Sequence, residues 1–156
     1  YTDHKEMLAN EDIDIVAVAT SDQAHKQATV DSLKAGCHVL CEKPMTLNAK
    51  DAEKVVAASK ETDKNFMVAH VVRFMKPYMV LRSIIESGEL GKLIRLDMKR
   101  ISGIPTWSWE DWMRDVKKSG GTPIDLSIHD LGFIYSVFGE PKAVNGIYQK
   151  LRGRKY

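Results

Sequence analysis

The sequence has little cysteine and almost no net charge. It contains two cysteines among 156 residues, and its 23 lysines and arginines against 21 aspartates and glutamates give a formal net charge of +2. Two cysteines are too few for a disulfide framework. Acidic and basic residues are interspersed, without the basic stripe that is typical of nucleic-acid-binding proteins. We therefore expect no nucleic-acid partner.

Long apolar runs are also missing. No stretch approaches the ~20 residues that span a bilayer, and the first residues lack a signal-peptide pattern. We expect no membrane partner and a cytoplasmic location. Cys37 and Cys41, placed on one strand, would lie roughly 13 Å apart, too far to form a disulfide or to share a metal. The sequence therefore predicts reduced, buried cysteines and no metal site.

Strand and helix patterns alternate through residues 1–72. Short runs rich in β-branched residues predict strands, and apolar residues at helical spacing predict the helices between them. The predicted order is strand 13–19, helix 25–35, strand 37–41, helix 49–61 and strand 66–71. Such alternation is typical of right-handed βαβ units, so we expect an α/β fold with a doubly wound parallel sheet.

The second half has a different pattern. Residues 93–102 alternate between apolar and polar side chains, as in a half-exposed strand of an antiparallel sheet. The predicted elements are helix 78–86, strand 93–102, helix 124–138 and strand 143–150. We therefore predict two partial domains, residues 1–74 with the parallel sheet and residues 75–156 with an α+β fold.

Polar residues follow each predicted parallel strand. Ligands of open parallel sheets bind beyond the carboxyl ends of the strands. Residues 20–22 (Thr-Ser-Asp), 42–44 (Glu-Lys-Pro) and 72–74 (Val-Arg-Phe) occupy those positions. A lysine held there can have a lowered pKa and pass protons. The alternative is a helix cap at residues 20–22 and a charged surface turn at residues 42–44, and the local pattern leaves both open.

A second set of polar residues lies on the predicted helix 124–138. Asp125 and His129 are four residues apart, which on one helix places their Cβ atoms ~5–6 Å from each other. A carboxylate beside an imidazole can fix its tautomer and make it a better base. An ordinary helical aspartate and histidine are the alternative. His25 either packs against a ligand or has a structural role, and His38 and His70 are expected to be structural.

Taken in order, these motifs resemble the Gfo/Idh/MocA family, which includes glucose–fructose oxidoreductases and inositol dehydrogenases. The Ala-Gly-x-His-Val-x-x-Glu-Lys-Pro run is the most specific part of the resemblance. The matching segments are Asp14–Thr20 with His25, Ala35–Pro44, Arg73-Phe74 with Pro77, Gly88–Gly91, and Asp125 with His129-Asp130.

The resemblance implies a two-domain oxidoreductase that uses NAD or NADP and acts on a sugar, cyclitol or related polyol. It also implies a homo-oligomer formed through the antiparallel sheet, and a cis Lys43–Pro44 peptide. The implied catalytic residues are Lys43, Asp125 and His129. The implied cofactor-binding residues are Ala19, Thr20, Ser21, His25, Glu42, Lys43 and Arg73. A non-catalytic sugar-sensing or protein-interaction member of the same fold is the alternative, because a fold does not fix a function.

The sequence also departs from the family pattern. It has no Gly-x-Gly-x-x-Gly loop, and Thr20-Ser21-Asp22 replaces the usual Thr-Pro-Asn. We therefore expect a fragment that lacks the N-terminal phosphate-binding region and the C-terminal end. Because that loop holds the dinucleotide phosphates, we expect the chain alone to bind NAD(P) weakly and to be inactive.

Overall fold

A computed structural model describes residues 1–103 and 105–147. Three strands, β1 (Ile15–Val18), β2 (His38–Glu42) and β3 (Phe66–Ala69), form a parallel sheet in the order β1-β2-β3. The predicted parallel sheet is confirmed. The carboxyl ends of all three strands therefore meet at one edge, where the segments that follow them lie close together.

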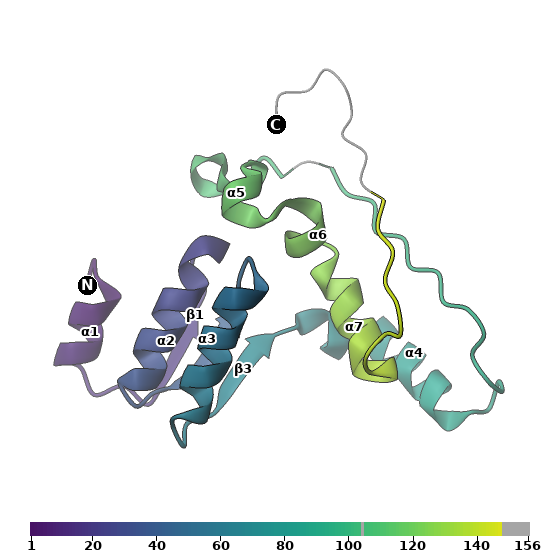
Figure 1. Ribbon diagram of the computed structural model, residues 1–156, viewed down its shortest axis with the longest axis horizontal. Coiled ribbons are helices and arrows are strands. Elements are labelled where there is room, and N and C mark those ends of the chain that lie inside the picture. The colour runs from purple at the N-terminus through teal and green to yellow at the C-terminus, as the bar shows by residue number, and fades with distance from the viewer. Residues whose placement is uncertain (104, 148–156) are drawn as a thin grey trace.

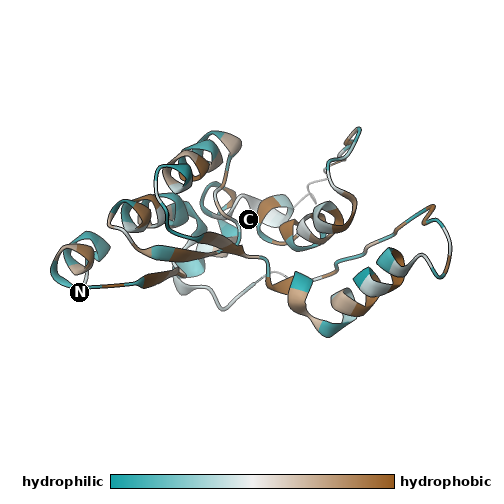
Figure 2. Ribbon diagram, turned by 90° about the horizontal axis from the view of Figure 1, so that it is seen from below, coloured by the Kyte–Doolittle hydropathy of each residue, from teal (hydrophilic) through white to brown (hydrophobic). Residues whose placement is uncertain are grey.

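The helices of this half lie on one side of the sheet (Figure 1; Figure 2). Helices α2 (His25–Lys34) and α3 (Ala49–Lys60) pack against each other, and α1 (His4–Asn10) contacts α2. Because successive right-handed crossovers here advance in one direction, both put their helix on the same face. The core beneath them consists of Val18, Ala28, Leu33, Val39, Cys41 and Ala58.

The opposite face of the sheet is open in the described residues. Ile15, Leu40 and Met67 point to that side and are 66%, 41% and 49% exposed. The described strands therefore form only the part of the predicted doubly wound sheet in which the helices cover a single face. A helix reaches the second face only where the strand order reverses, and three strands in sequence order contain no reversal.

Local sequence signals explain the limits of the helices in this half. The Asn48 side chain caps α3 by accepting the N–H of Asp51 at 2.9 Å. Gly36 follows α2 with φ of 85°, a conformation that glycine adopts without strain, and the chain turns there into β2. Cys37 and Cys41 are free and buried, as predicted.

Beyond β3 the structure is helical. A short 3₁₀ turn, η2 (Val71–Phe74), leads into α4 (Lys76–Ser87), which ends at Gly88 with φ of 67°. Residues 92–103 form no strand, and neither do residues 143–147; residues 148–150 of the last predicted strand lie outside the described residues. The predicted antiparallel sheet is therefore absent from the described part of the chain.

The physical reason is the lack of a partner. A strand is stable only when its N–H and C=O groups pair and its apolar face is covered. Ile94 and Ile101 are 96% and 93% exposed, and Leu96 and Met98 are only half-buried, so the apolar positions of this segment lack the cover of a packed sheet. Alternation in sequence predicts a strand only where a second strand is available.

The predicted helix 124–138 is divided in two. It consists of α6 (Gly121–Asp125) and α7 (Ile128–Phe138), separated by a turn at residues 126–127. Two short helical segments precede it, η3 (Trp109–Arg114) and α5 (Val116–Ser119). The break puts Asp125 and His129 on different helices, so the prediction that they share one helix face is wrong.

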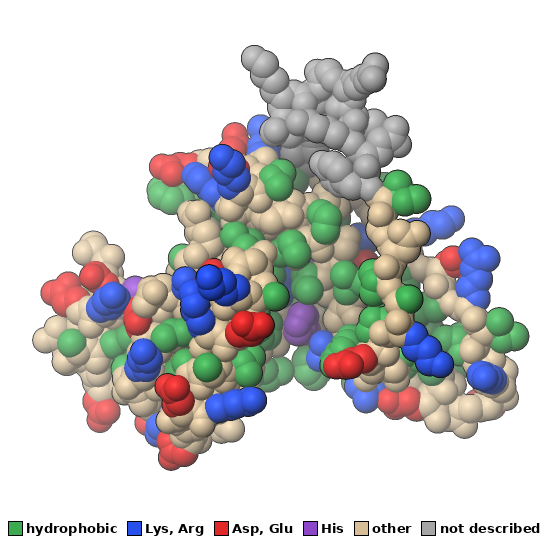
Figure 3. Space-filling model, viewed as in Figure 1, with side chains coloured by type: hydrophobic (Ala, Val, Ile, Leu, Met, Phe, Trp, Pro, Cys, Tyr) green, Lys and Arg blue, Asp and Glu red, His purple; other side chains and the backbone are tan. Residues whose placement is uncertain are grey.

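The surface carries both signs of charge, interspersed on the face seen in Figure 3. Among the helices of the described residues, none combines the length and the apolar character needed to cross a membrane.

Candidate active site

Lys43 follows β2 at the carboxyl edge of the sheet, and its peptide bond to Pro44 is cis, as expected. Its Nζ donates to the Asp125 carboxylate Oδ1 at 2.6 Å and to the Asp125 main-chain oxygen at 2.8 Å. The two side chains are 17% and 15% exposed, so the ion pair is largely shielded from water. It joins the end of β2 to the end of α6, across 82 residues of sequence.

Asp125 therefore contacts Lys43, which sequence reasoning did not predict. No hydrogen bond between Asp125 and His129 is present in the described residues, where the Asp125 carboxylate bonds to Lys43 instead. The turn between α6 and α7 separates Asp125 from the imidazole. Asp125 still acts on the pKa of His129 through its charge, as one of the weaker effects on that ring.

His129 lies in the first turn of α7, half-buried, with Nδ1 shielded from solvent and without a partner in the described residues. Burial first, and then the positive charges of Lys43 and Arg100, lower the pKa of His129 below its ordinary value. The imidazole is therefore neutral at neutral pH. A neutral imidazole can accept a proton at the ring nitrogen that carries no hydrogen.

Asp130, next to His129 in sequence, anchors this end of α7. The Arg100 guanidinium donates to both Asp130 carboxylate oxygens at 2.7 Å and to the Tyr78 hydroxyl at 3.0 Å. The Arg100 pairing holds the pKa of Asp130 below its ordinary value. This network holds α7 against α4 and the segment before η3. In the sequence, only Asp130 of the family pattern pointed to it.

Asp22 is a buried carboxyl that sequence reasoning considered only as one of residues 20–22, either a ligand-binding segment or a helix cap. It opens the 3₁₀ turn η1 (Asp22–Ala24), is 4% exposed, and its Oδ2 has no partner in the described residues. Burial and then the charge of Asp125 raise the pKa of Asp22 to about 6, whereas His25 and Lys43 oppose the rise. The sequence feature that could have pointed to this carboxyl is that Asp22 stands where the family pattern usually has asparagine.

The expected cofactor-side residues after β1 and β2 lie at the sheet edge. Ala19, Thr20 and Glu42 are exposed, and Ser21 is half-buried. A hydroxyl and a carboxylate accessible at this edge are suited to ribose or amide groups of a dinucleotide. The sequence has no glycine-rich phosphate loop, so the residues present fit the nicotinamide and ribose portion alone.

His25 does not face the edge of the sheet. It is 1% exposed, with Nδ1 2.7 Å from the Pro44 main-chain oxygen and Nε2 3.0 Å from that of Thr20. Its ring connects the turn after β1 to the turn after β2.

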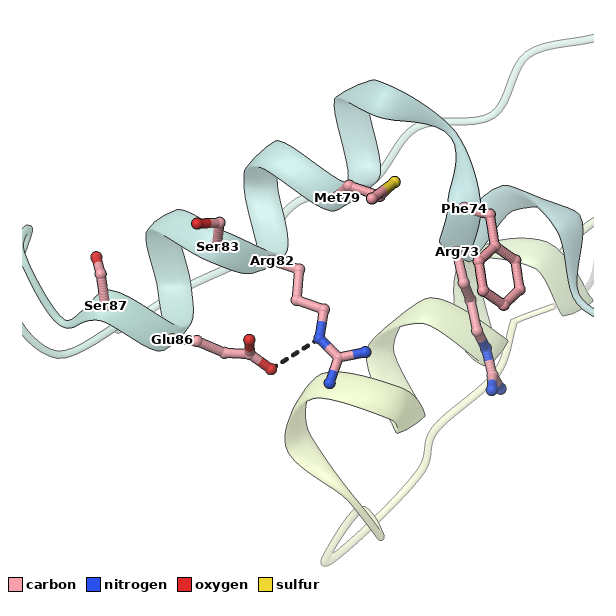
Figure 4. Close-up of a pocket in the computed structure, with 7 residues that line it drawn as sticks. All are labelled: Arg73, Phe74, Met79, Arg82, Ser83, Glu86 and Ser87. Carbon is pink, nitrogen blue, oxygen red and sulfur yellow. Dashed lines mark hydrogen bonds and ion pairs between the residues drawn. The ribbon is translucent and has the colours of Figure 1, made fainter.

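Arg73 lies on η2, and its Nε is buried without a partner in the described residues. It also lines a shallow pocket along α4, whose seven residues Figure 4 shows, with Arg82 and Glu86 paired at 2.7 Å. Lys43, Asp125 and His129 are not among the residues that line it. We therefore place the chemistry at Lys43 and not in this pocket.

The side-chain arrangement gives no support for a metal centre. Within residues 1–103 and 105–147, no group of three or more histidine, cysteine, aspartate or glutamate side chains is arranged to hold a metal ion.

Comparison with known proteins links this geometry to a family. Residues 1–70 match the "Oxidoreductase family, NAD-binding Rossmann fold" model, and residues 78–155 match the "GFO/IDH/MocA C-terminal domain" model. Similar curated proteins are trans-1,2-dihydrobenzene-1,2-diol dehydrogenase from Bos taurus, 34% identical over 91% of this chain, and myo-inositol 2-dehydrogenase from Thermotoga maritima, 29% identical over 90%.

Solved structures agree with these matches. The crystal structure of myo-inositol 2-dehydrogenase from Lactobacillus plantarum is 26% identical, with a TM-score of 0.74 over 89% of this chain and 41% of that one. The chain spans 42% and 40% of the lengths of the two curated relatives.

Proposed function

Since the chain belongs to the Gfo/Idh/MocA family of oxidoreductases, we propose that it forms part of an NAD(P)-dependent dehydrogenase that acts on a secondary alcohol of a sugar, cyclitol or related polyol. The observation that carries the proposal is the juxtaposition of a shielded Lys43–Asp125 ion pair with a neutral histidine, His129, at the carboxyl edge of a parallel sheet. The names of the relatives, an inositol dehydrogenase and a dihydrodiol dehydrogenase, support a cyclic alcohol as substrate.

Residues of this chain would hold the nicotinamide and ribose part of NAD or NADP. Thr20 and Glu42 are accessible at the strand ends, and Lys43 projects from the same edge. When bound, the nicotinamide would supply the group that accepts or returns a hydride. His25 was also expected on the cofactor side, but in this proposal it holds the turns after β1 and β2 together. Arg73 stays a proposed cofactor-side residue.

The proton chemistry is assigned to His129 and Lys43. His129, kept neutral by burial and by the neighbouring cations, takes the proton of the substrate hydroxyl. Lys43 donates a hydrogen bond to the same oxygen and stabilises the negative charge that develops there. Asp125 holds the lysine ammonium in place through its carboxylate and its main-chain oxygen. Asp125 is thus a positioning residue for Lys43.

The alternative is a non-catalytic member that senses a sugar or binds another protein. The cost of shielding an ion pair argues against it, because a buried pair is often no more stable than apolar residues of the same size. An unpartnered ring nitrogen of His129 beside such a pair would not strengthen ligand binding in a pure binding module. Perturbed titratable groups gathered at a sheet edge favour catalysis.

Three further parts of the proposal concern the whole protein. We place the boundary between the two domains at residues 74 and 75, within the connection between η2 and α4. The full-length protein would be a cytoplasmic homo-oligomer whose interface is an antiparallel sheet, to which residues 93–102 would contribute once a partner strand is available.

The test is an oxidation assay with the full-length gene product. A panel of cyclitols, sugars and dihydrodiols is offered with NAD and with NADP, and formation of the reduced cofactor is followed by absorbance. Wild type should oxidise at least one polyol, Lys43→Met should lose most of this activity, and Lys50→Met, at an exposed lysine on α3, should retain it. Equal activity of the two variants, or no turnover of any polyol by wild type, would contradict the proposal.

A further inference from the structure

His25 is enclosed between two main-chain oxygens. Its side chain is 1% exposed, and it lies at the start of α2 beneath the edge of the sheet. Nδ1 is 2.7 Å from the oxygen of Pro44, and Nε2 is 3.0 Å from the oxygen of Thr20. Both distances are those of N–H···O hydrogen bonds.

The two contacts constrain the protonation of the ring. A carbonyl oxygen only accepts, so each ring nitrogen must carry a hydrogen to bond to it. Neutral imidazole has one N–H, and either tautomer would set a nitrogen lone pair against an oxygen lone pair at one of the two contacts. Only the imidazolium donates at both nitrogens.

We propose that His25 is a buried imidazolium at neutral pH that fastens the turn after β1, through Thr20, to the turn after β2, through Pro44. Since Pro44 follows Lys43 directly, the same contacts fix the main chain from which the lysine projects. His25 is then a positioning residue for Lys43, and this last step alone rests on the proposed function.

The groups around His25 are compatible with a buried cation. A buried charge is tolerated only when it is hydrogen-bonded and near an opposite charge. The carboxyl of Asp22 on η1 and the thiol of Cys41 on β2 are the titratable groups that face it. Burial opposes the charged ring, but the interactions with Cys41, Pro44 and Thr20 outweigh it and raise the pKa of His25 to about 9.

His38 offers a matched comparison within the same sheet. Its Nδ1 accepts the main-chain N–H of Asn65 at 2.9 Å, so that nitrogen carries no hydrogen. The geometry therefore assigns opposite states to two histidines 13 residues apart: His38 is neutral with its hydrogen on Nε2, and His25 is protonated on both nitrogens.

Nitrogen NMR of the full-length gene product, labelled with ¹⁵N in the histidine rings, tests the protonation directly. At neutral pH, His25 should show two N–H nitrogens and His38 one. His25 should lose a proton only as the pH rises through about 9. His25→Gln and His38→Gln assign the signals. If His25→Gln fails to fold, sequential resonance assignment of the folded wild-type protein identifies the His25 ring nitrogens instead. An unprotonated ring nitrogen on His25 at neutral pH overturns the proposal.

Kinetics then test the positioning role separately. His25→Gln should lower kcat at least tenfold, a larger factor than the accompanying rise in the KM for the cofactor through Thr20, whereas His38→Gln should change neither. An unchanged kcat in His25→Gln refutes the positioning of Lys43. Two protonated nitrogens on His25 in a protein that oxidises no polyol would refute the proposed function and leave the imidazolium intact.

Discussion

The ion pair between Lys43 and Asp125 should be the most sensitive link between the parallel sheet and the helices after it. Lys43→Met removes the ammonium and keeps most of the side-chain length. The Asp125 carboxylate, which is 15% exposed in the wild type, then loses its 2.6 Å donor. Breaking a buried pair by removing one partner costs about 3–5 kcal/mol. Because both side chains keep some contact with water, we expect the lower limit, about 3 kcal/mol.

Asp125→Asn is expected to lower the free energy of unfolding by less than Lys43→Met does. The Lys43 ammonium keeps its 2.8 Å bond to the main-chain oxygen of residue 125, and the new amide oxygen can still accept from it. A loss of about 2 kcal/mol is expected, within the range for a hydrogen bond to a charged group. Since either single change already destroys the pair, the double variant should lose about 3 kcal/mol rather than the sum of about 5 kcal/mol.

Urea unfolding of the four proteins, followed by circular dichroism, measures these free energies. Lys50→Met serves as the matched control, because Lys50 is exposed on α3 and should change stability by less than about 0.5 kcal/mol. The reasoning fails if Lys43→Met behaves like Lys50→Met. It also fails if the losses of the two single variants add in the double variant, because the side chains would then not be coupled.

Three further predictions follow from individual side chains. His129→Ala should lower kcat by about 10²–10⁴-fold with cofactor affinity unchanged, as measured by steady-state kinetics and calorimetry, and an unaltered kcat refutes its role as base. The pKa of Asp22, raised to about 6 by burial and by Asp125, means that the folded state binds its proton more tightly than the unfolded chain. The free energy of unfolding should therefore fall by up to about 3 kcal/mol as the pH rises from the ordinary value of 3.8 through 6, and this slope should be absent in Asp22→Asn when unfolding is measured across that range. Gly120→Ala should cost about 2–4 kcal/mol in urea unfolding, because φ is +70° and the new Cβ would lie 2.5 Å from Cβ of Ile124, whereas Gly36→Ala, with φ of +85° and no atom within 4 Å, should cost about 1 kcal/mol.

Residues 1–72 were predictable because their elements are specified locally. Strands of β-branched residues, the Asn48 cap and Gly36 lie within or beside the elements they define. The parallel sheet follows from this alternation alone. That only one face is covered follows from strand order, which the sequence pattern does not contain.

The predictions for the later elements were wrong because those elements depend on tertiary contacts. Residues 93–102 alternate like a strand, but a strand needs a partner, and none is present among the described residues. The spacing of Asp125 and His129 predicted a shared helix face, and the turn at residues 126–127 removes it. The partner that Asp125 does have, Lys43, lies 82 residues away, a distance that no local spacing rule spans.

The buried groups were the least predictable part of the site. His25 and Asp22 follow a strand as surface-turn residues do, yet they are 1% and 4% exposed. Their burial results from the packing of η1 and α2 under the sheet edge, which depends on the whole fold. The family resemblance located Lys43, whereas the groups that hold Lys43 in place required the structure.

The most direct test of the central claim is transfer of deuterium from substrate to cofactor. The full-length gene product is incubated with NAD or NADP and a polyol deuterated at its carbinol carbons, and the reduced cofactor is analysed by mass spectrometry. The account predicts one deuterium in each reduced nicotinamide, at a rate that His129→Ala lowers. Reduced cofactor without deuterium, or no reduced cofactor with any polyol, would contradict it.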